Sequence, residues 1–314
     1  MRLDRNLPSL VTLSVFVLLY AACAVQFPFM VSGRVADNLL TDNAFLGVLA
    51  VGMTVVILSG GIDLSVGAVV AFVGVLLALL IGNGVDPFLA FAIALAAGTL
   101  YGALIGAAIH WLQAPPFIVT LAAMFLARGA CFLLTTDSIP ITHPVYGDLA
   151  SGGLGLSISA WAMLVAFAAG IVLLRLTRFG ADVHAIGGDA RAAELMGVRV
   201  GRTTVMIYAF SGLCAALGGI LFSVYTQSAH SLAGVGLELD AIAAVVIGGT
   251  LLTGGYGGLL GSFFGVLILG LIQTYITFTG TLSSWWAKIA TGVLLFLFIA
   301  MQRTVLLLRA SDER

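Results

Sequence analysis

Charged side chains are scarce in this sequence. Only 9% of its 314 residues are Asp, Glu, Lys or Arg, against about 25% in ordinary soluble domains, whereas 61% are hydrophobic. The 13 basic and 14 acidic side chains are too few to cover a water-soluble globule of this size. The composition therefore excludes a soluble enzyme, a nucleic-acid-binding protein and a disordered chain, and the net charge of -1 carries no information about partners.

Residues for catalysis and for cofactor binding are equally scarce. The single lysine, Lys288, lies in the run WAKIA, so the chain has no GxxxxGK[ST] loop to bind ATP phosphates. The four histidines show no HExxH spacing, and no serine lies in a GxSxG motif. Cys23, Cys131 and Cys214 lie far apart in apolar runs, which favours small buried side chains over disulfides or metal ligands. We therefore expect no catalytic residues, no metal and no cofactor.

Apolar runs that could cross a bilayer, by contrast, are abundant. A transmembrane helix needs about 20 apolar residues, and ten candidates are present. They cover approximately residues 8–30, 40–58, 64–81, 87–109, 117–135, 158–174, 204–224, 237–252, 259–278 and 285–302. Several are short and bounded by glycine pairs, so we expect tilted, broken or re-entrant helices. The predicted fold is an all-α, polytopic integral membrane bundle that forms one domain over residues 1–314.

Arginines indicate the orientation of this bundle. They gather before the first run (Arg2, Arg5), between the sixth and seventh runs (Arg175, Arg178, Arg191, Arg199, Arg202) and at or after the last run (Arg303, Arg309, Arg314). The positive-inside rule places all three groups in the cytoplasm, and the even numbers of runs between them agree with this. Both termini are then cytoplasmic, residues 136–157 form an extracytoplasmic loop, and residues 175–203 form a cytoplasmic loop. The first run is too long for a cleaved signal peptide and is expected to stay as an anchor.

Two charged positions interrupt the first half, and each has two interpretations. Asp63 and Ser65 follow the pair Gly60-Gly61 at a cytoplasm-side break, where they either cap the next helix or contact a substrate. Arg128 lies near the middle of an apolar run. An arginine there must find a carboxylate or backbone carbonyls as partners, or else line a pore.

The second half contains similar polar positions. Glu238 and Asp240 open an apolar helix that we expect to begin at the extracytoplasmic side, where carboxylates complement the positive end of the helix. Gln273, Thr274 and Tyr275 are polar residues within the ninth run, and they meet either sugar hydroxyls or neighbouring helices.

The cytoplasmic loop at residues 175–203 contains its own structural signal. Asp189 is followed by an Ala-rich stretch up to Met196 and then by Gly197, which predicts a short helix with an N-cap and a C-cap. Such a helix between glycines either docks a partner protein or lies among lipid headgroups.

Four motifs in this order resemble the ribose-type sugar permeases of bacterial ABC importers. They are SGGIDLSVG at residues 59–67, FIVTL and ARG at 117–121 and 127–129, TRFG and AIGG at 177–180 and 185–188, and ELDAIAAVVIGGT at 238–250. The resemblance implies a permease subunit of the bacterial inner membrane that is not itself an enzyme. It also implies an ABC ATPase subunit, which binds the ATP, and a periplasmic sugar-binding protein as partners.

The same resemblance assigns the cytoplasmic loop to ATPase coupling. The residues implied are Arg178, Phe179, Gly180, Gly187, Gly188, Asp189, Arg191, Glu194 and Gly197.

Further segments are similar to the second, smaller permease subunit of galactofuranose importers. They are TDNAFLG at residues 41–47, SIPITHP at 138–144, LAGVG at 232–236, LIQTYI at 271–276 and GTLSSWW at 280–286. This similarity implies that galactofuranose or a related pentose or hexose is carried. It also implies a second permease, either another copy or a homologous chain, with a heterodimer favoured.

Two functions therefore remain open. The first is an ATP-driven sugar permease whose substrate path includes Asn43, Asp63, Ser65, Thr120, Arg128, Asp240 and Gln273. The second is an ion-coupled secondary carrier that needs no partner and uses Asp63, Asp240 and Arg128 for coupling.

Overall fold

The computed structural model describes residues 7–150, 155–283 and 285–312, with side chains from residue 9 to residue 301. The expected cytoplasmic residues Arg2, Arg5 and Arg314 lie outside the described residues, as do the side chains of Arg303 and Arg309.

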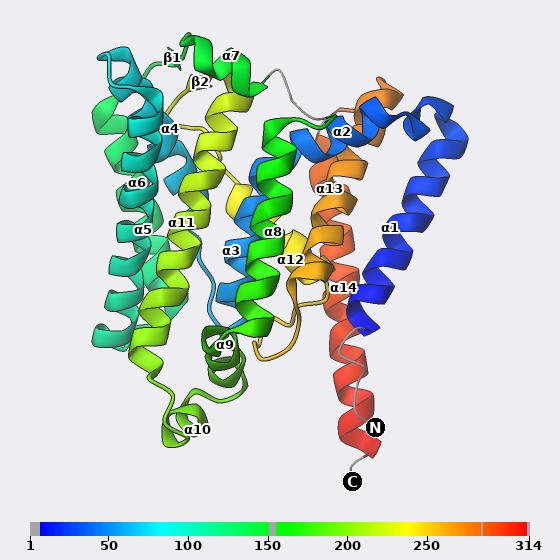
Figure 1. Ribbon diagram of the computed structural model, residues 1–314. Coiled ribbons are helices and arrows are strands. Elements are labelled where there is room, and N and C mark those ends of the chain that lie inside the picture. Colours follow the sequence, from blue (N-terminus) through cyan, green and yellow to red (C-terminus); the bar gives the residue numbers. More distant parts are fainter. Residues whose placement is uncertain (1–6, 151–154, 284, 313–314) are drawn as a thin grey trace.

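Within those ranges the chain is helical almost throughout, which confirms the all-α expectation (Figure 1). The helices are α1 (Leu7–Gln26), η1 (Pro28–Val31), α2 (Gly33–Asp42), α3 (Ala44–Leu58), α4 (Val66–Gly82), α5 (Pro87–Leu112), α6 (Pro116–Leu134), α7 (Pro144–Ala150), α8 (Ile158–Leu176), α9 (Arg178–Gly188), α10 (Ala190–Leu195), α11 (Val200–Thr226), α12 (Leu237–Ile247), α13 (Leu259–Thr279) and α14 (Trp285–Asp312). Two short strands, β1 (Ile139–Pro140) and β2 (Ser228–Ala229), pair antiparallel.

Each of the ten expected runs contains a helix, but the helices differ in length. Among the described residues, six are long and apolar enough to cross a membrane alone: α1, α5, α6, α8, α11 and α13. The bent pair α2 and α3, with 53° between its halves, makes a seventh. The helix α4 and the described apolar part of α14 are shorter, and α12 has only 11 residues. Of these, α4 follows the break at Gly60-Gly61 and α12 follows a segment that contains Gly234 and Gly236.

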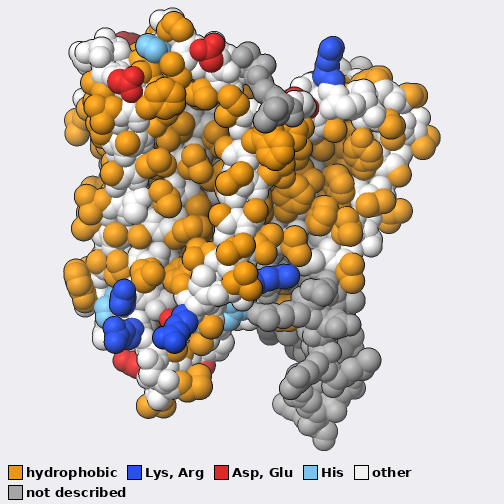
Figure 2. Space-filling view, viewed as in Figure 1, with side chains coloured by type: hydrophobic (Ala, Val, Ile, Leu, Met, Phe, Trp, Pro, Cys, Tyr) orange, Lys and Arg blue, Asp and Glu red, His pale blue; other side chains and the backbone are white. Residues whose placement is uncertain are grey.

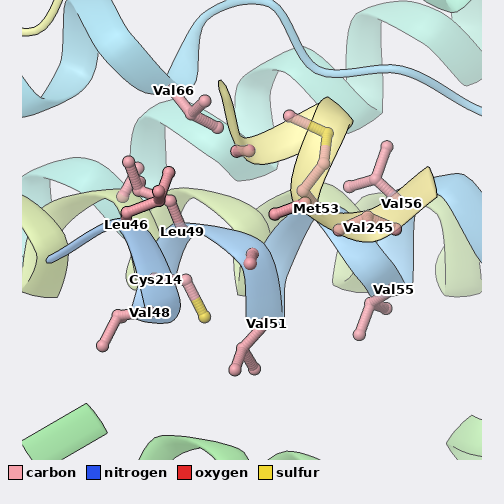
Figure 3. Close-up of a cluster of buried hydrophobic side chains, with 14 of the residues drawn as sticks. Leu46, Val48, Leu49, Val51, Met53, Val55, Val56, Val66, Cys214 and Val245 are labelled. Atoms are coloured by element: carbon pink, nitrogen blue, oxygen red, sulfur yellow. The ribbon is translucent and has the colours of Figure 1, made fainter. Parts of the chain in front are cut away.

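The helix α3 runs through the centre of the bundle. Every residue from Leu46 to Leu58 is buried, because α3 contacts α8, α11, α12 and α13 on different sides. A helix that is apolar all round belongs inside a protein rather than at its surface. Figure 3 shows Met53 and Val56 of α3 beside Val245 of α12, within a cluster of buried aliphatic side chains.

The helices α5 and α11 pack with their backbones close together. An added Cβ at Gly102 of α5 would overlap the carbonyl oxygen of Tyr208, and one at Gly98 would lie 2.6 Å from the Cβ of Ala216. Small residues allow this approach, which compensates for the absence of a hydrophobic driving force between helices in lipid. The pair forms the most extensive helix contact within the described residues.

Charge separates along the bundle axis. Figure 2 shows hydrophobic side chains over the middle of the visible face and most positive side chains at the end where α9 and α10 lie. The helix α1 begins and α14 ends at that same end (Figure 1). The loop at residues 136–157 lies at the opposite end and contains β1 and α7, while residues 151–154 of it are outside the described part.

Candidate functional site: two broken helices and a cytoplasmic helix pair

The first break separates α3 from α4. Residues 59–65 leave the end of α3 beside α9 and run back into the bundle before α4 begins (Figure 1). Gly60 has a φ of +83°, a backbone conformation that glycine adopts without strain. The side chain of Asp63 in this segment is only 1% exposed. The break therefore starts at the predicted cytoplasmic end, but the carboxylate lies inside the bundle rather than at its surface.

Hydroxyl groups surround the Asp63 carboxylate. Its Oδ1 accepts hydrogen bonds from the Ser65 backbone N–H at 2.9 Å and from the Ser65 hydroxyl at 2.6 Å, and its Oδ2 accepts one from Ser211 of α11 at 2.7 Å. Asp63 thus holds the turn just before α4 and ties it to α11. The Ser65 side chain caps none of the free N–H groups of α4, so of the two proposed caps only the Asp63 bond to the Ser65 N–H is present.

The second break precedes α12. An 11-residue helix rises about 16 Å, roughly half of the ~30 Å hydrocarbon layer. The loop that follows α12 touches the end of α3, where the Gly255 N–H donates to the Leu58 carbonyl at 2.9 Å. The helix α12 must therefore begin near mid-depth. This corrects the expectation that Glu238 and Asp240 open a helix at the extracytoplasmic surface.

The two broken helices meet at their N-terminal ends. An added Cβ at Gly67 of α4 would overlap the Glu238 carboxylate of α12 and lie 2.6 Å from the Gly234 carbonyl oxygen. Glu238 also accepts a hydrogen bond from the Gly236 N–H at 3.2 Å. A carboxylate in this place compensates the positive ends of both helices.

Two residues of α6 donate hydrogen bonds to the segments that form the two breaks. The Arg128 guanidinium donates to the carbonyl oxygens of Ser231 and Ala233, each at 2.6 Å, in the segment that leads to α12. The Thr120 hydroxyl donates to the Ile62 carbonyl at 3.1 Å, in the segment that leads to α4. Of the interpretations given for Arg128, pairing with backbone carbonyls is therefore the one that the structure contains.

Asp240 has a different partner from the one that helix capping predicts. Its two carboxylate oxygens accept hydrogen bonds from the Lys288 ammonium group of α14 at 2.8 and 2.6 Å. The Lys288 side chain is 54% exposed and that of Asp240 is 21% exposed. The only lysine of the sequence thus joins α12 to α14.

Asn43 and Gln273 lie apart from the Asp63 group. Asn43 begins α3 at the end opposite Leu58, where its side-chain amide donates to the Leu39 carbonyl at 2.8 Å and packs against Gly270 of α13. Gln273 follows three residues later in α13, and its side chain is exposed. The structure therefore brings Asp63, Ser65, Thr120 and Arg128 to the two breaks, while Asn43, Gln273 and Asp240 occupy other places.

The cytoplasmic loop folds into two helices rather than one. The predicted helix is α10, where the Asp189 carboxylate accepts hydrogen bonds from the N–H groups of Arg191 and Ala192 at 2.8 and 2.9 Å. Gly197 follows with a φ of +91°, as expected for a C-cap. The additional helix is α9, whose start is capped by Thr177. A cleft of about 630 Å³ is lined by α9, by α11 and by residues 196–199 after α10, and its lining includes Arg178, Phe179, Gly197, Arg199 and Arg202.

The end of α9 contacts both the end of α3 and the loop that follows α12. An added Cβ at Gly187 would overlap the Leu58 carbonyl oxygen and lie 2.5 Å from the Gly255 nitrogen. Gly254 and Gly255 adopt φ values of +85° and +75° in the loop after α12, and the Gly255 N–H is bonded to Leu58. A movement of α9 therefore acts directly on the end of α3 and on the loop after α12.

Sequence reasoning missed several residues of this site. Ser211 and Tyr208 of α11 approach the first break; the Ser211 hydroxyl bonds to Asp63, and an added Cβ at Gly61 would overlap the Tyr208 hydroxyl. Within the described residues, no group of three or more His, Cys, Asp or Glu side chains could hold a metal ion.

This chain is similar in sequence to several known proteins. Residues 35–299 match the family model described as branched-chain amino acid transport system / permease component. The chain is 57% identical to the inner membrane ABC transporter permease protein YjfF of Escherichia coli strain K12, over 96% of this chain and 93% of that protein. It is 38% identical to the fructose import permease protein FruG of Bifidobacterium longum, over 97% and 93%. It is 41% identical to the ribose import permease protein RbsC of Bacillus subtilis, over 85% and 84%. No solved structure matches.

Proposed function

Because this chain belongs to the family of ABC sugar-import permeases of the bacterial inner membrane, we propose that it forms the sugar passage of an importer driven by a partner ATPase. The proposed cargo is a monosaccharide, namely galactofuranose or a related pentose or hexose, delivered by a periplasmic binding protein. The proposed assembly contains a second permease, with a heterodimer favoured. The proposed passage includes Asp63, Ser65, Thr120 and Arg128 at the breaks, together with Asn43, Asp240 and Gln273.

The contact of α9 with the end of α3 and with the loop after α12 is the observation that carries this proposal. The helices α9 and α10 project from the end of the bundle (Figure 1), and their Leu195 and the adjacent Met196 are 90% and 75% exposed. An ATPase that grips this projection at the cytoplasmic face can move Gly187 and, through it, the ends of α3 and α12. A rigid connection of this kind can convert a movement of the ATPase into a change in which side of the membrane the passage opens to. We assign ATP binding to the partner.

Reconstitution in liposomes tests the proposal. The purified chain, its candidate ATPase, second permease and binding protein are combined, and ATP hydrolysis is measured while sugars are added in turn. We expect one sugar to stimulate hydrolysis and to enter the vesicles only when ATP and the binding protein are present. Direct titration of the binding protein then compares galactofuranose with ribose and fructose. Uptake by this chain alone, driven by a proton or sodium gradient, would instead establish a secondary carrier.

Substitutions in the helix pair test the coupling itself. Gly180→Ala places a Cβ against the Leu174 carbonyl oxygen at the start of α9, and Arg191→Ala removes an arginine from the first turn of α10. Both variants should remain in the membrane and lose sugar-stimulated ATP hydrolysis. Gly129→Ala is a matched control, because an added Cβ there meets no atom within 4 Å. Undiminished stimulation in both coupling variants would contradict the docking of the ATPase on this loop.

A further inference from the structure

A cavity of about 570 Å³ lies at the cytoplasmic end of the bundle, between helices that are long enough to span the membrane. Its walls include Ser9 of α1, Ile171 and Arg175 of α8, His184 of α9, and residues 257–260, which lead into α13. The helix α13 contacts both α1 and α8 (Figure 1). The cavity therefore lies where three spans meet the first helix of the cytoplasmic pair.

The charged side chains that line this cavity are basic. Arg175 lies in the last turn of α8, is exposed, and forms no ion pair with a carboxylate of the described residues. The Nδ1 atom of His184 donates a hydrogen bond to the Gly180 carbonyl at 2.8 Å, so its Nε2 atom is the one left for a ligand. The acidic residue of α9, Asp182, lines the cleft on the other side of that helix. The positive end of α13, which no side chain caps at Gly258, adds to the same field, so the cavity favours an anion.

Apolar side chains beside the cavity face away from the protein. Leu10 of α1 is 54% exposed, and Val172 and Leu176 of α8 are 52% and 78% exposed. Ile171 lies about one helical turn, roughly 6 Å, nearer the membrane centre than Arg175, so the cavity reaches from the basic end of α8 towards the hydrocarbon. Figure 2 shows the hydrophobic band of the visible face ending where the positive side chains begin. A ligand in this cavity therefore meets positive charge and lipid-facing apolar surface together.

We propose that this cavity binds the phosphodiester headgroup of an anionic phospholipid from the cytoplasmic leaflet. Arg175 donates to the phosphate oxygens, and His184 donates from Nε2 when its ring is doubly protonated. The acyl chains lie on the exposed apolar side chains of α1 and α8. Basic pockets between transmembrane helices on the cytoplasmic side bind anionic headgroups in this way. A free phosphate ion offers the same charge but no apolar part, so it leaves that apolar surface uncovered.

Native mass spectrometry of the full-length chain in detergent tests this proposal. Phosphatidylglycerol, phosphatidylcholine with the same acyl chains, or inorganic phosphate is added at increasing concentration, and the molecules bound per chain are counted. Arg175→Gln removes the positive charge of α8 from the cavity, and Arg175→Lys keeps it. Arg202→Gln is the matched control, because Arg202 is also exposed at the cytoplasmic end but lines the cleft on the other side of α9. The measurement needs neither sugar nor ATPase, so its outcome is independent of the proposed function.

We expect phosphatidylglycerol to bind more tightly than phosphatidylcholine. Arg175→Gln should weaken the binding of phosphatidylglycerol by roughly 10- to 150-fold, as expected for the loss of a hydrogen bond to a charged group. Arg175→Lys should retain most of the binding, and Arg202→Gln should bind like the unmodified chain.

Three results would overturn the proposal. Equal losses in Arg175→Gln and Arg202→Gln, or no loss in either, would show that the lipid is attracted by surface charge alone. A variant Arg175→Lys that binds as weakly as Arg175→Gln would show that positive charge in the cavity does not hold the lipid. Inorganic phosphate that displaces phosphatidylglycerol at equal concentration would identify a site for a free anion instead.

Discussion

Replacing Gly187 with alanine should separate ATP hydrolysis from sugar movement. The new Cβ would lie 2.5 Å from the Gly255 nitrogen, whereas real Cβ contacts essentially never fall below 3.0 Å. The end of α9 must therefore withdraw from the loop after α12 by at least about 0.5 Å, and further from the overlapping Leu58 oxygen. The 2.9 Å hydrogen bond between Gly255 and Leu58 lies in the same contact and is strained by the same shift.

The size of the expected change in ATP use per sugar follows from the free-energy cost of placing a methyl group in a packed site. Such overpacking costs about 1–3 kcal/mol. If that cost falls on the state in which α9 packs against the end of α3 and the loop after α12, the equilibrium between transporter states shifts by roughly 5- to 150-fold. The number of ATP molecules hydrolysed per sugar imported should rise by a factor in this range.

The assay compares Gly187→Ala with a glycine variant outside the coupling loop in proteoliposomes. Imported radiolabelled sugar and released phosphate are measured together for Gly187→Ala and for Gly129→Ala. An added Cβ at Gly129 meets no atom within 4 Å, so this variant should transport like the unmodified protein. Copurification of the ATPase with both variants shows that assembly is intact. Equal ratios of ATP to sugar in the two variants would refute the reasoning that Gly187 transmits the movement.

Three further substitutions test the packing of the bundle, with thermal unfolding in detergent as the measurement. Gly102→Ala should destabilise the protein by about 1–3 kcal/mol because the added Cβ overlaps a backbone carbonyl of α11. Gly129→Ala should leave the stability unchanged. Equal unfolding midpoints for the two variants would contradict the close packing of α5 and α11. Arg128→Ala should lower the unfolding midpoint because two carbonyl groups lose their hydrogen-bond donor, which costs about 1–3 kcal/mol of stability for each group left buried. Arg128→Lys should lose less stability because lysine keeps a donor. A lysine variant as unstable as the alanine variant would contradict this role of Arg128. Ser211→Ala removes a 2.7 Å hydrogen bond to the Asp63 carboxylate, worth about 1.5–3 kcal/mol, and an unchanged midpoint would show that the bond is dispensable.

The class of fold followed from the sequence because its physical causes are local. Scarcity of charge and long apolar runs require a membrane, and glycine pairs mark the places where helices break. The short helix after Asp189 was also predictable, since an N-cap, an Ala-rich stretch and a C-cap glycine are all adjacent in the chain. These features need no knowledge of distant partners.

The geometry of the site was not predictable in the same way, because its partners are distant in sequence. Ser211 lies 148 residues from Asp63, and nothing in either local stretch indicates their bond. The partners of Arg128 are backbone carbonyls, which every residue carries, so no residue type marks them. The apolar run at residues 237–252 was counted among the candidate spans, and only the contact of its following loop with Leu58 reveals that α12 begins at mid-depth.

The glycine-lined contact of α5 with α11 has a consequence for biosynthesis. The first helix ends at Leu112 and the second begins at Val200, so 87 residues are translated between them. At a synthesis rate of about 5–20 residues per second, roughly 4–17 s pass after the earlier helix is complete before translation of its main neighbour begins. During that interval its small-residue stripe is open to lipid or to the insertion machinery. The amino-terminal half of the protein is thus inserted before it is fully assembled, and the close contact between α5 and α11 forms late.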